Sequence, residues 1–234
     1  MITKYLMNQY NIRKDLPSVK VDKALIEQLE NYILFDVPSI IGIDKELILK
    51  NYSLEIVDSL GSAKFSRISE FPFSIFQNGT EKIIFGSRYY SDPYFCVQIY
   101  FSKRKYSTVI EINLKCDNPS ALATAIYNEI LLRIKQYKAY NSIYHNDYLP
   151  LIGGASIGIM LGGIILLYFN FSHWGLYIYV LLLLISFIAA KGEHLKPYCE
   201  FSTSKQLQNN RTFNYIVLSI IIPLVITILY DVLK

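Results

Sequence analysis

The chain has 234 residues, of which 52% are hydrophobic and only 18% are charged, whereas about a quarter of the residues of soluble domains are charged. Residues 1–148 hold 18 Lys and Arg with 16 Asp and Glu, but residues 149–234 hold only five and three. This composition argues against a wholly soluble protein. The net charge of +4 is too small and too dispersed to indicate nucleic acid binding.

The first predicted element is an amphipathic helix over residues 18–34. Leu25, Ile26, Leu29 and Ile33 fall on one helical face, and either Ser18 or Asp22 is suited to cap its N-terminus.

Residues 47–116 predict an antiparallel sheet of four or five strands. Apolar and polar residues alternate there with a period of two, most clearly from Ile110 to Cys116, which is typical of half-buried strands. Short turn sequences, such as Asn78-Gly79, separate the strands and favour hairpins.

A second helix is predicted after Asp117-Asn118-Pro119, with an apolar stripe that suits the inner face of the sheet. The fold class expected for residues 1–146 is therefore α+β: helix, sheet, helix. We expect a fragment that ends near Tyr140 to fold alone, because both helices and all predicted strands precede that residue.

Residues 147–234 are expected to form a membrane domain of three transmembrane helices. No charge occurs from Tyr148 to Ala190 or from Thr212 to Tyr230, and these runs are long enough to cross a bilayer. The expected spans are about 149–170, 174–190 and 213–230, with a cytoplasmic loop at 191–212.

Basic residues flank the first span and occupy the 191–212 loop, which predicts a multi-pass protein of the cell inner membrane with a cytoplasmic N-terminal domain. The N-terminus has no continuous apolar core, so no secretory signal peptide is predicted. The three cysteines form no CxxC pair, and a reducing compartment suits them.

Gly154, Gly158 and Gly162 form a GxxxGxxxG run, which allows another helix to approach closely. Two interpretations stay open: self-association, with or without a pore, and packing against a span of the same chain.

Two further surfaces are candidates for binding. Lys103, Arg104 and Lys105 lie at a predicted hairpin tip and suit contact with lipid headgroups or anions, or form a solvated turn. A second group of side chains suits a recognition surface on the outer face of the sheet, although packing explains it equally well: Tyr89, Tyr90, Tyr94, Tyr100 and Tyr106.

No pattern indicates a cofactor, a metal site or catalytic residues, so we expect a protein that is not an enzyme. The ligands near His194 are too sparse for a metal.

In overall layout, a small cytoplasmic domain followed by a few spans resembles the membrane effectors of bacterial anti-phage defence systems, although no specific family is indicated. That resemblance implies an effector whose domain senses an unidentified cytoplasmic protein or signal molecule, and whose spans associate to disturb the lipid bilayer. The alternatives are a membrane-anchored adaptor that binds a protein and a headgroup-level membrane enzyme.

Overall fold

The structure, a computed structural model, describes residues 9–91, 93–148, 151, 154–155, 196–204, 208, 219 and 223. The chain divides into two compact units, of which the first comprises residues 1–140 and 198–204 and the second residues 141–197 and 205–234. The first unit is an α+β domain, which we call the sheet domain.

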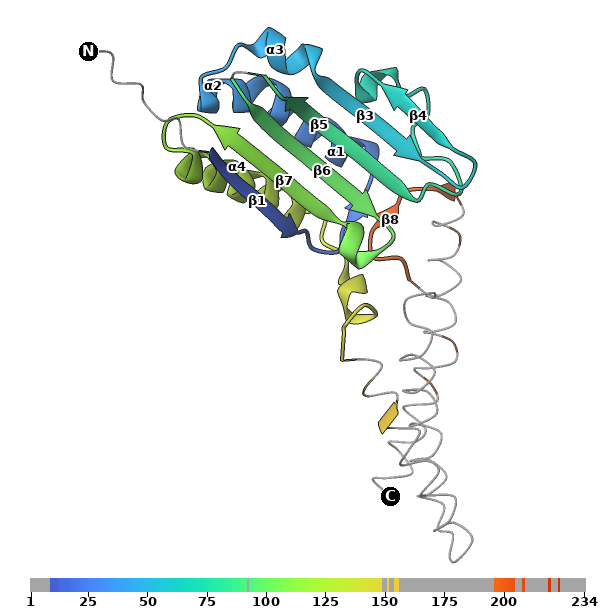
Figure 1. The fold of residues 1–234 in the computed structure, drawn as a ribbon. Helices are drawn as coiled ribbons and strands as arrows, with labels where there is room; N and C mark the ends of the chain where they lie inside the picture. Colours follow the sequence, from blue (N-terminus) through green and yellow to red (C-terminus); the bar gives the residue numbers. More distant parts are fainter. Residues whose placement is uncertain are drawn as a thin grey trace, which may run out of the picture. The chain divides into compact units, whose positions relative to one another are not determined.

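Six strands form one antiparallel sheet in the order β1-β7-β6-β5-β3-β4 (Figure 1). Every neighbouring pair is antiparallel, and the sheet's first and last strands lie at its edges. The strands are β1 (Gln9–Asp15), β3 (Tyr52–Val57), β4 (Ser62–Phe65), β5 (Lys82–Tyr89), β6 (Phe95–Ser102) and β7 (Val109–Lys115).

The described helices lie on one face of this sheet (Figure 1). Helix α1 (Lys23–Asn31) begins where the Asp22 carboxylate accepts a hydrogen bond from the Leu25 N–H, so Asp22 is the N-cap. Helix α4 (Pro119–Lys135) is the longest helix of the layer that covers this face. The shorter elements are α2 (Val37–Ile41), α3 (Lys45–Lys50), η1 (Tyr32–Asp36), η2 (Ile68–Glu70), η3 (Lys105–Ser107) and η4 (Tyr140–Ile143).

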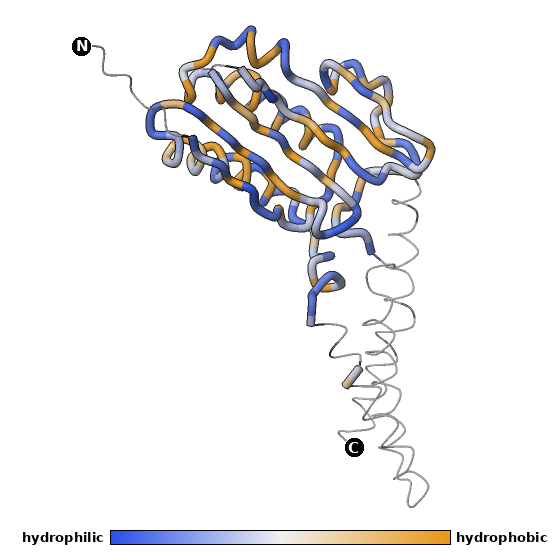
Figure 2. The backbone as a smooth tube through the Cα atoms, in the orientation of Figure 1, coloured by the Kyte–Doolittle hydropathy of each residue, from blue (hydrophilic) through white to orange (hydrophobic). Residues whose placement is uncertain are grey.

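The core lies between the sheet and the helices. Hydrophobic and hydrophilic residues alternate along the central strands (Figure 2), because neighbouring side chains on a strand point to opposite faces. The inner positions of β5, β6 and β7 are buried: Ile83, Phe85, Val97, Ile99, Phe101, Ile110, Ile112 and Leu114.

The first helical stretch both begins and ends later than the predicted 18–34, because Lys20–Val21 form strand β2 and the helix begins at Lys23. After α1 the chain passes through the π-helical turn η1 into α2 and ends at Gly42, which is left-handed with φ 69°. Pro38 explains the turn, because its ring is incompatible with the ordinary i→i−4 pattern. The Val37 N–H donates instead to the Tyr32 carbonyl, five residues back, which accommodates the proline without ending the helix.

Residues 198–204 belong to the sheet domain although they are distant in sequence. Strand β8 (Glu200–Phe201) pairs in parallel with β2 (Lys20–Val21), and Figure 1 shows β8 beside the main sheet. This corrects the expectation that a fragment ending near Tyr140 contains the whole domain. The predicted loop at 191–212 therefore includes a buried strand.

The expected sheet of four or five strands is also wrong in number. The structure adds β1, which the sequence pattern does not predict because Ile12 is its only buried residue. An edge strand has one neighbour and much solvent exposure, so its apolar alternation is weak. The overall α and β content agrees with the expectation.

The expected three-span membrane domain is contradicted. No helix within the described residues is both long enough and apolar enough to cross a membrane. Helix α4, with 17 residues, carries Glu129, Arg133 and Lys135 because it packs on the sheet with one face only. An apolar run satisfies the composition of a span, but a span also requires one continuous helix of that length. The windows 149–170, 174–190 and 213–230 lie almost wholly outside the described residues.

Candidate functional site

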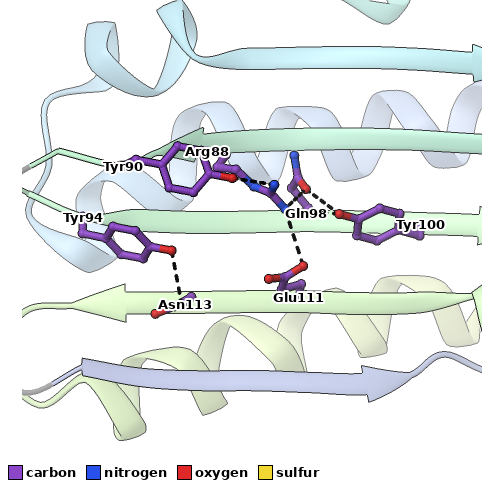
Figure 3. Close-up of polar contacts among 7 residues, drawn as sticks. All are labelled: Arg88, Tyr90, Tyr94, Gln98, Tyr100, Glu111 and Asn113. Atoms are coloured by element: carbon purple, nitrogen blue, oxygen red, sulfur yellow. Dashed lines mark hydrogen bonds and ion pairs between the residues drawn. The ribbon is translucent and has the colours of Figure 1, made fainter.

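The candidate site is the face of the sheet that no described helix covers. Polar side chains from three adjacent strands, β5, β6 and β7, and from the loop between β5 and β6 gather there (Figure 3). The register places Arg88 beside Cys96 and places Gln98 beside Glu111, so these side chains share one face. We call the following seven residues the outer-face cluster: Arg88, Tyr90, Tyr94, Gln98, Tyr100, Glu111 and Asn113.

Arg88 is the centre of the cluster. One guanidinium nitrogen, Nη1, donates to the Tyr90 hydroxyl at 2.6 Å. The other, Nη2, donates to Gln98 Oε1 and lies 3.3 Å from the Tyr100 hydroxyl. Nη2 also lies 3.5 Å from the Glu111 carboxylate, and both side chains are about 30% exposed, at 31% and 28%. The guanidinium is thus oriented by several groups and still reaches solvent.

The hydroxyls of the three tyrosines in the cluster differ in whether they donate or accept a hydrogen bond. Tyr100 donates to Gln98 Oε1 at 2.6 Å, whereas Tyr90 accepts from Arg88 and Tyr94 accepts from Asn113 Nδ2 at 3.4 Å. The rings of Tyr90 and Tyr94 lie 5.9 Å apart. Because Tyr90 and Tyr94 accept in these bonds, their hydroxyl hydrogens are available for donation to a ligand.

Gly86 lies in the same face and brings two strands close together. Its φ is +143°, and a Cβ placed on it would lie 2.0 Å from the Val97 carbonyl oxygen. It pairs with Gln98 on β6 and with Ser53 on β3. The absence of a side chain at this position allows the β6 backbone to pass close to β5 beside Gln98.

The electrostatics of the cluster favour hydrogen-bond donation over proton transfer. Burial raises the pKa of Cys96, with hydrogen bonding to Arg88 acting in the opposite direction. Burial likewise raises the pKa of Tyr94 and that of Tyr100. Burial opposes the charge on Arg88, but hydrogen bonding to Cys96 and Tyr90 outweighs it, and the pKa of Arg88 rises. At neutral pH the cluster therefore holds the Arg88 cation among neutral tyrosine hydroxyls and a neutral thiol, with the Glu111 carboxylate 3.5 Å from the guanidinium.

The structure describes only one of the three glycines expected to pack helices. Gly154 is exposed, and a Cβ placed on it would meet no described atom within 4 Å. Gly158 and Gly162 lie outside the described residues. The glycine zipper is accordingly not supported, because the described residues contain no helix long and apolar enough to span a membrane. The expected inner-membrane location stays a prediction.

Lys103, Arg104 and Lys105 lie at the tip of the hairpin between β6 and β7. Arg104 is exposed, and the other two are partly buried. The Lys105 ammonium lies 5.3 Å from the ring centroid of Tyr106. The Lys103 N–H donates to the Glu81 carbonyl, and the Lys103 carbonyl accepts from the Tyr198 N–H. Contact of this tip with lipid or anions stays a prediction.

Of the five tyrosines expected on the outer face, the structure brings three into the cluster: Tyr90, Tyr94 and Tyr100. Tyr89 points inward and packs against Phe95, and Tyr106 lies in η3 at the hairpin tip. The sequence analysis missed Arg88, Gln98, Glu111 and Asn113. Gln98, Glu111 and Asn113 alternate with apolar residues along β6 and β7, and this alternation could have indicated them. The register of β5 against β6 is needed to place Arg88 beside them.

The other polar candidates do not assemble into a site. Within the described ranges no group of three His, Cys, Asp or Glu side chains is placed to hold a metal. His145 is buried, with Nε2 2.8 Å from the Lys196 carbonyl oxygen, while His173 and His194 lie outside the described residues.

Comparisons of the chain with protein-family models, with curated proteins and with solved structures found no match.

Proposed function

We propose that the sheet domain is a recognition module that binds an acidic segment of a partner protein on the outer face of its sheet. The observation that carries this proposal is the partly exposed guanidinium of Arg88, held among tyrosine hydroxyls on a face that no described helix covers. Arginine and tyrosine dominate the binding energy of many protein interfaces.

Charge selects the class of partner. Arg88 lies 3.5 Å from Glu111, which is longer than the roughly 2.7–2.9 Å of a direct charge-assisted hydrogen bond, so a ligand carboxylate competes for the guanidinium. Basic side chains also outnumber acidic ones at the outward positions of the strands: Arg13, Lys64, Lys82, Arg88 and Lys115 against Asp15, Glu55 and Glu111.

Binding is a better account of the cluster than catalysis. A general base works best with a pKa near the working pH, and an activated thiol needs a lowered one. The pKa values of Cys96, Tyr94 and Tyr100 all move upward. These three groups therefore stay neutral, and Tyr94, which accepts from Asn113, keeps its hydroxyl hydrogen for a ligand.

The hypothesis that partner binding triggers membrane disturbance concerns segments outside the described residues, and it stays a prediction. Leakage from liposomes on addition of the chain is the measurement that addresses it. The recognition proposal does not depend on the result.

The recognition proposal is tested with a fluorescent glutamate-rich peptide that contains one tyrosine, titrated into the full chain and followed by anisotropy. We expect saturable binding that weakens as salt is added. Arg88→Ala should weaken it by about thirtyfold, because truncating a hot-spot residue costs about 2 kcal/mol. The same peptide with Gln in place of Glu should bind poorly.

The matched control is Lys135→Ala, which removes the same charge from an exposed position at the end of α4. It should leave the affinity nearly unchanged. Equal losses in the two variants would indicate non-specific attraction, and equal binding of the Gln peptide would show that the carboxylates are not recognised. Either result would overturn the proposal.

A further inference from the structure

Residues 198–204 occupy the sheet domain as an extended strand held on both sides. Towards β2, the Glu200 N–H donates to the Val19 carbonyl and the Ser202 N–H donates to the Val21 carbonyl, each at 2.9 Å. Towards the hairpin, the Tyr198 N–H donates to the Lys103 carbonyl at 2.8 Å. We call this segment the docked strand.

Side chains reinforce this backbone pairing. The Tyr198 hydroxyl donates to the Leu16 carbonyl at 3.0 Å, and Ser18 Oγ donates to the Tyr198 carbonyl at 2.7 Å. Phe201 is buried and packs edge-on against Phe76, with 6.2 Å between ring centroids. The docked strand thus fills a groove made by β2, the hairpin and the loop before β5.

Thr108 connects the docked strand to the hairpin between β6 and β7. Its Oγ1 accepts from the Ser102 N–H at 3.2 Å and lies 3.0 Å from the Ser102 carbonyl oxygen. Cys199 Sγ lies 3.6 Å from the same hydroxyl, and the Cys199 N–H donates to the Ser102 carbonyl at 3.2 Å. One buried hydroxyl therefore joins the two strands that carry Gln98, Tyr100 and Glu111 to the docked strand.

We propose that the docked strand is a releasable ligand of its groove, and that its release is coupled through Thr108 and the hairpin to the outer-face cluster. The coupling rests on the proposed function, because it links binding of a partner on the outer face to release of the docked strand. The release itself does not require that function. A partner that binds more tightly to one conformation of the hairpin therefore changes the affinity of the groove for the docked strand.

The three cysteines of the chain report on this coupling without any added ligand. Cys199 is buried in the docked strand, Cys96 is buried beneath the outer-face cluster, and Cys116 is partly exposed beyond the end of β7. Burial raises the pKa of Cys199 to about 11, so its thiol is protonated and shielded while the strand is docked. Alkylation of the native full chain, followed by mass spectrometry, gives the rate at each cysteine separately.

We expect Cys199 to be labelled through a local opening with a weaker urea dependence than global unfolding. Tyr198→Phe removes one buried hydrogen bond of the docked strand and should raise the Cys199 rate by roughly five- to tenfold. Thr108→Val should raise the rates at both Cys199 and Cys96 and leave Cys116 unchanged.

Two controls separate this result from general destabilisation. Tyr106→Phe removes a hydroxyl from the exposed hairpin tip, and Ser87→Ala removes the buried hydrogen bond to the Ile48 carbonyl on the far side of the sheet. Neither should raise the Cys199 rate.

Labelling of Cys199 only with global unfolding would overturn the proposal, because the strand would then be a permanent part of the core. Local labelling of Cys199 with no change at Cys96 in Thr108→Val would overturn the coupling. Neither outcome bears on Arg88 and the acidic peptide, so failure of this proposal is distinguishable from failure of the recognition proposal.

Discussion

Gly86 and Arg88 lie two residues apart on β5, and the strand needs a different property at each. Gly86 must lack a side chain because β6 passes too close, and Arg88 must carry a long one that reaches three strands. Substitution of Gly86 therefore acts through backbone strain, whereas substitution of Arg88 acts through the loss of side-chain contacts.

Gly86→Ala should destabilise the sheet domain by about 1–3 kcal/mol or more, because a positive φ is costly for alanine and its Cβ meets backbone. Gly61→Ala is the control, since a Cβ at Gly61 meets nothing within 4 Å, and its effect should stay within about 0.5 kcal/mol. Urea unfolding measures both. Equal stabilities of Gly86→Ala and the parent chain would contradict the strain assigned here.

Glu30 predicts a pH dependence of stability. Burial raises the pKa of its carboxyl above 4.5, against the opposing hydrogen bond from the Ile68 N–H. As pH rises from 4.5 towards the raised pKa, the unfolded chain releases this proton before the folded chain does, so the free energy of unfolding falls. The loss is complete above the raised pKa.

Glu30→Gln keeps an oxygen that can accept the Ile68 N–H at 3.0 Å and removes the titration. The stability of this variant relative to the parent should therefore increase with pH across that window, as measured by urea unfolding at several pH values. A relative stability that falls with pH would mean that the charged form is the favoured one in the fold.

Among the elements, the two long helices and the central strands were predictable because their apolar periods are strong. Leu25, Ile26 and Leu29 mark α1, and the alternation from Ile110 to Leu114 marks β7. Strand β1 was missed because its edge position leaves Ile12 alone buried. The two-residue β8 was missed because so short a strand has no period, and its burial depends on tertiary pairing with β2.

The N-cap of α1 gives a prediction at this scale. Asp22→Ala removes the bond to the Leu25 N–H at 2.8 Å and should cost about 1 kcal/mol. Asp44→Ala removes the equivalent bond at α3, a six-residue helix, and should cost less, because α1 carries more of the core. Thermal melts compare the two, and a larger loss at Asp44 would contradict this ranking.

For the whole molecule, the candidate site could be predicted only in part. The polar phase of each strand indicates which residues share a face, but pairing of β5 with β6 and of β6 with β7 decides which of them meet. The hairpins themselves were predictable from the short turns, but their register depends on the geometry of each turn, which the apolar alternation alone does not fix. The division between units was equally hidden, because residues 198–204 return to a domain that the chain leaves at Tyr140.

A fragment of residues 9–140 should be less stable than the same domain with its docked strand restored. Tyr198, Cys199 and Phe201 are buried, and losing them exposes the groove at a cost of roughly 3–5 kcal/mol. A synthetic peptide of residues 196–205 should raise the melting temperature of the fragment, and the same peptide with Phe201→Ala should raise it less. Equal melting of the fragment with and without the peptide would contradict this.

The pairing of β2 with β8 also bears on synthesis of the chain. The groove is complete once residue 140 has been made, but its occupant follows only after residues 141–197 have been translated. At about 5–20 residues per second, that interval lasts roughly 3–12 s, far longer than a hairpin needs to form. The nascent domain therefore spends seconds with Val19, Val21 and Phe76 uncovered, and a chaperone or a neighbouring nascent chain can reach this groove before the protein's own strand does.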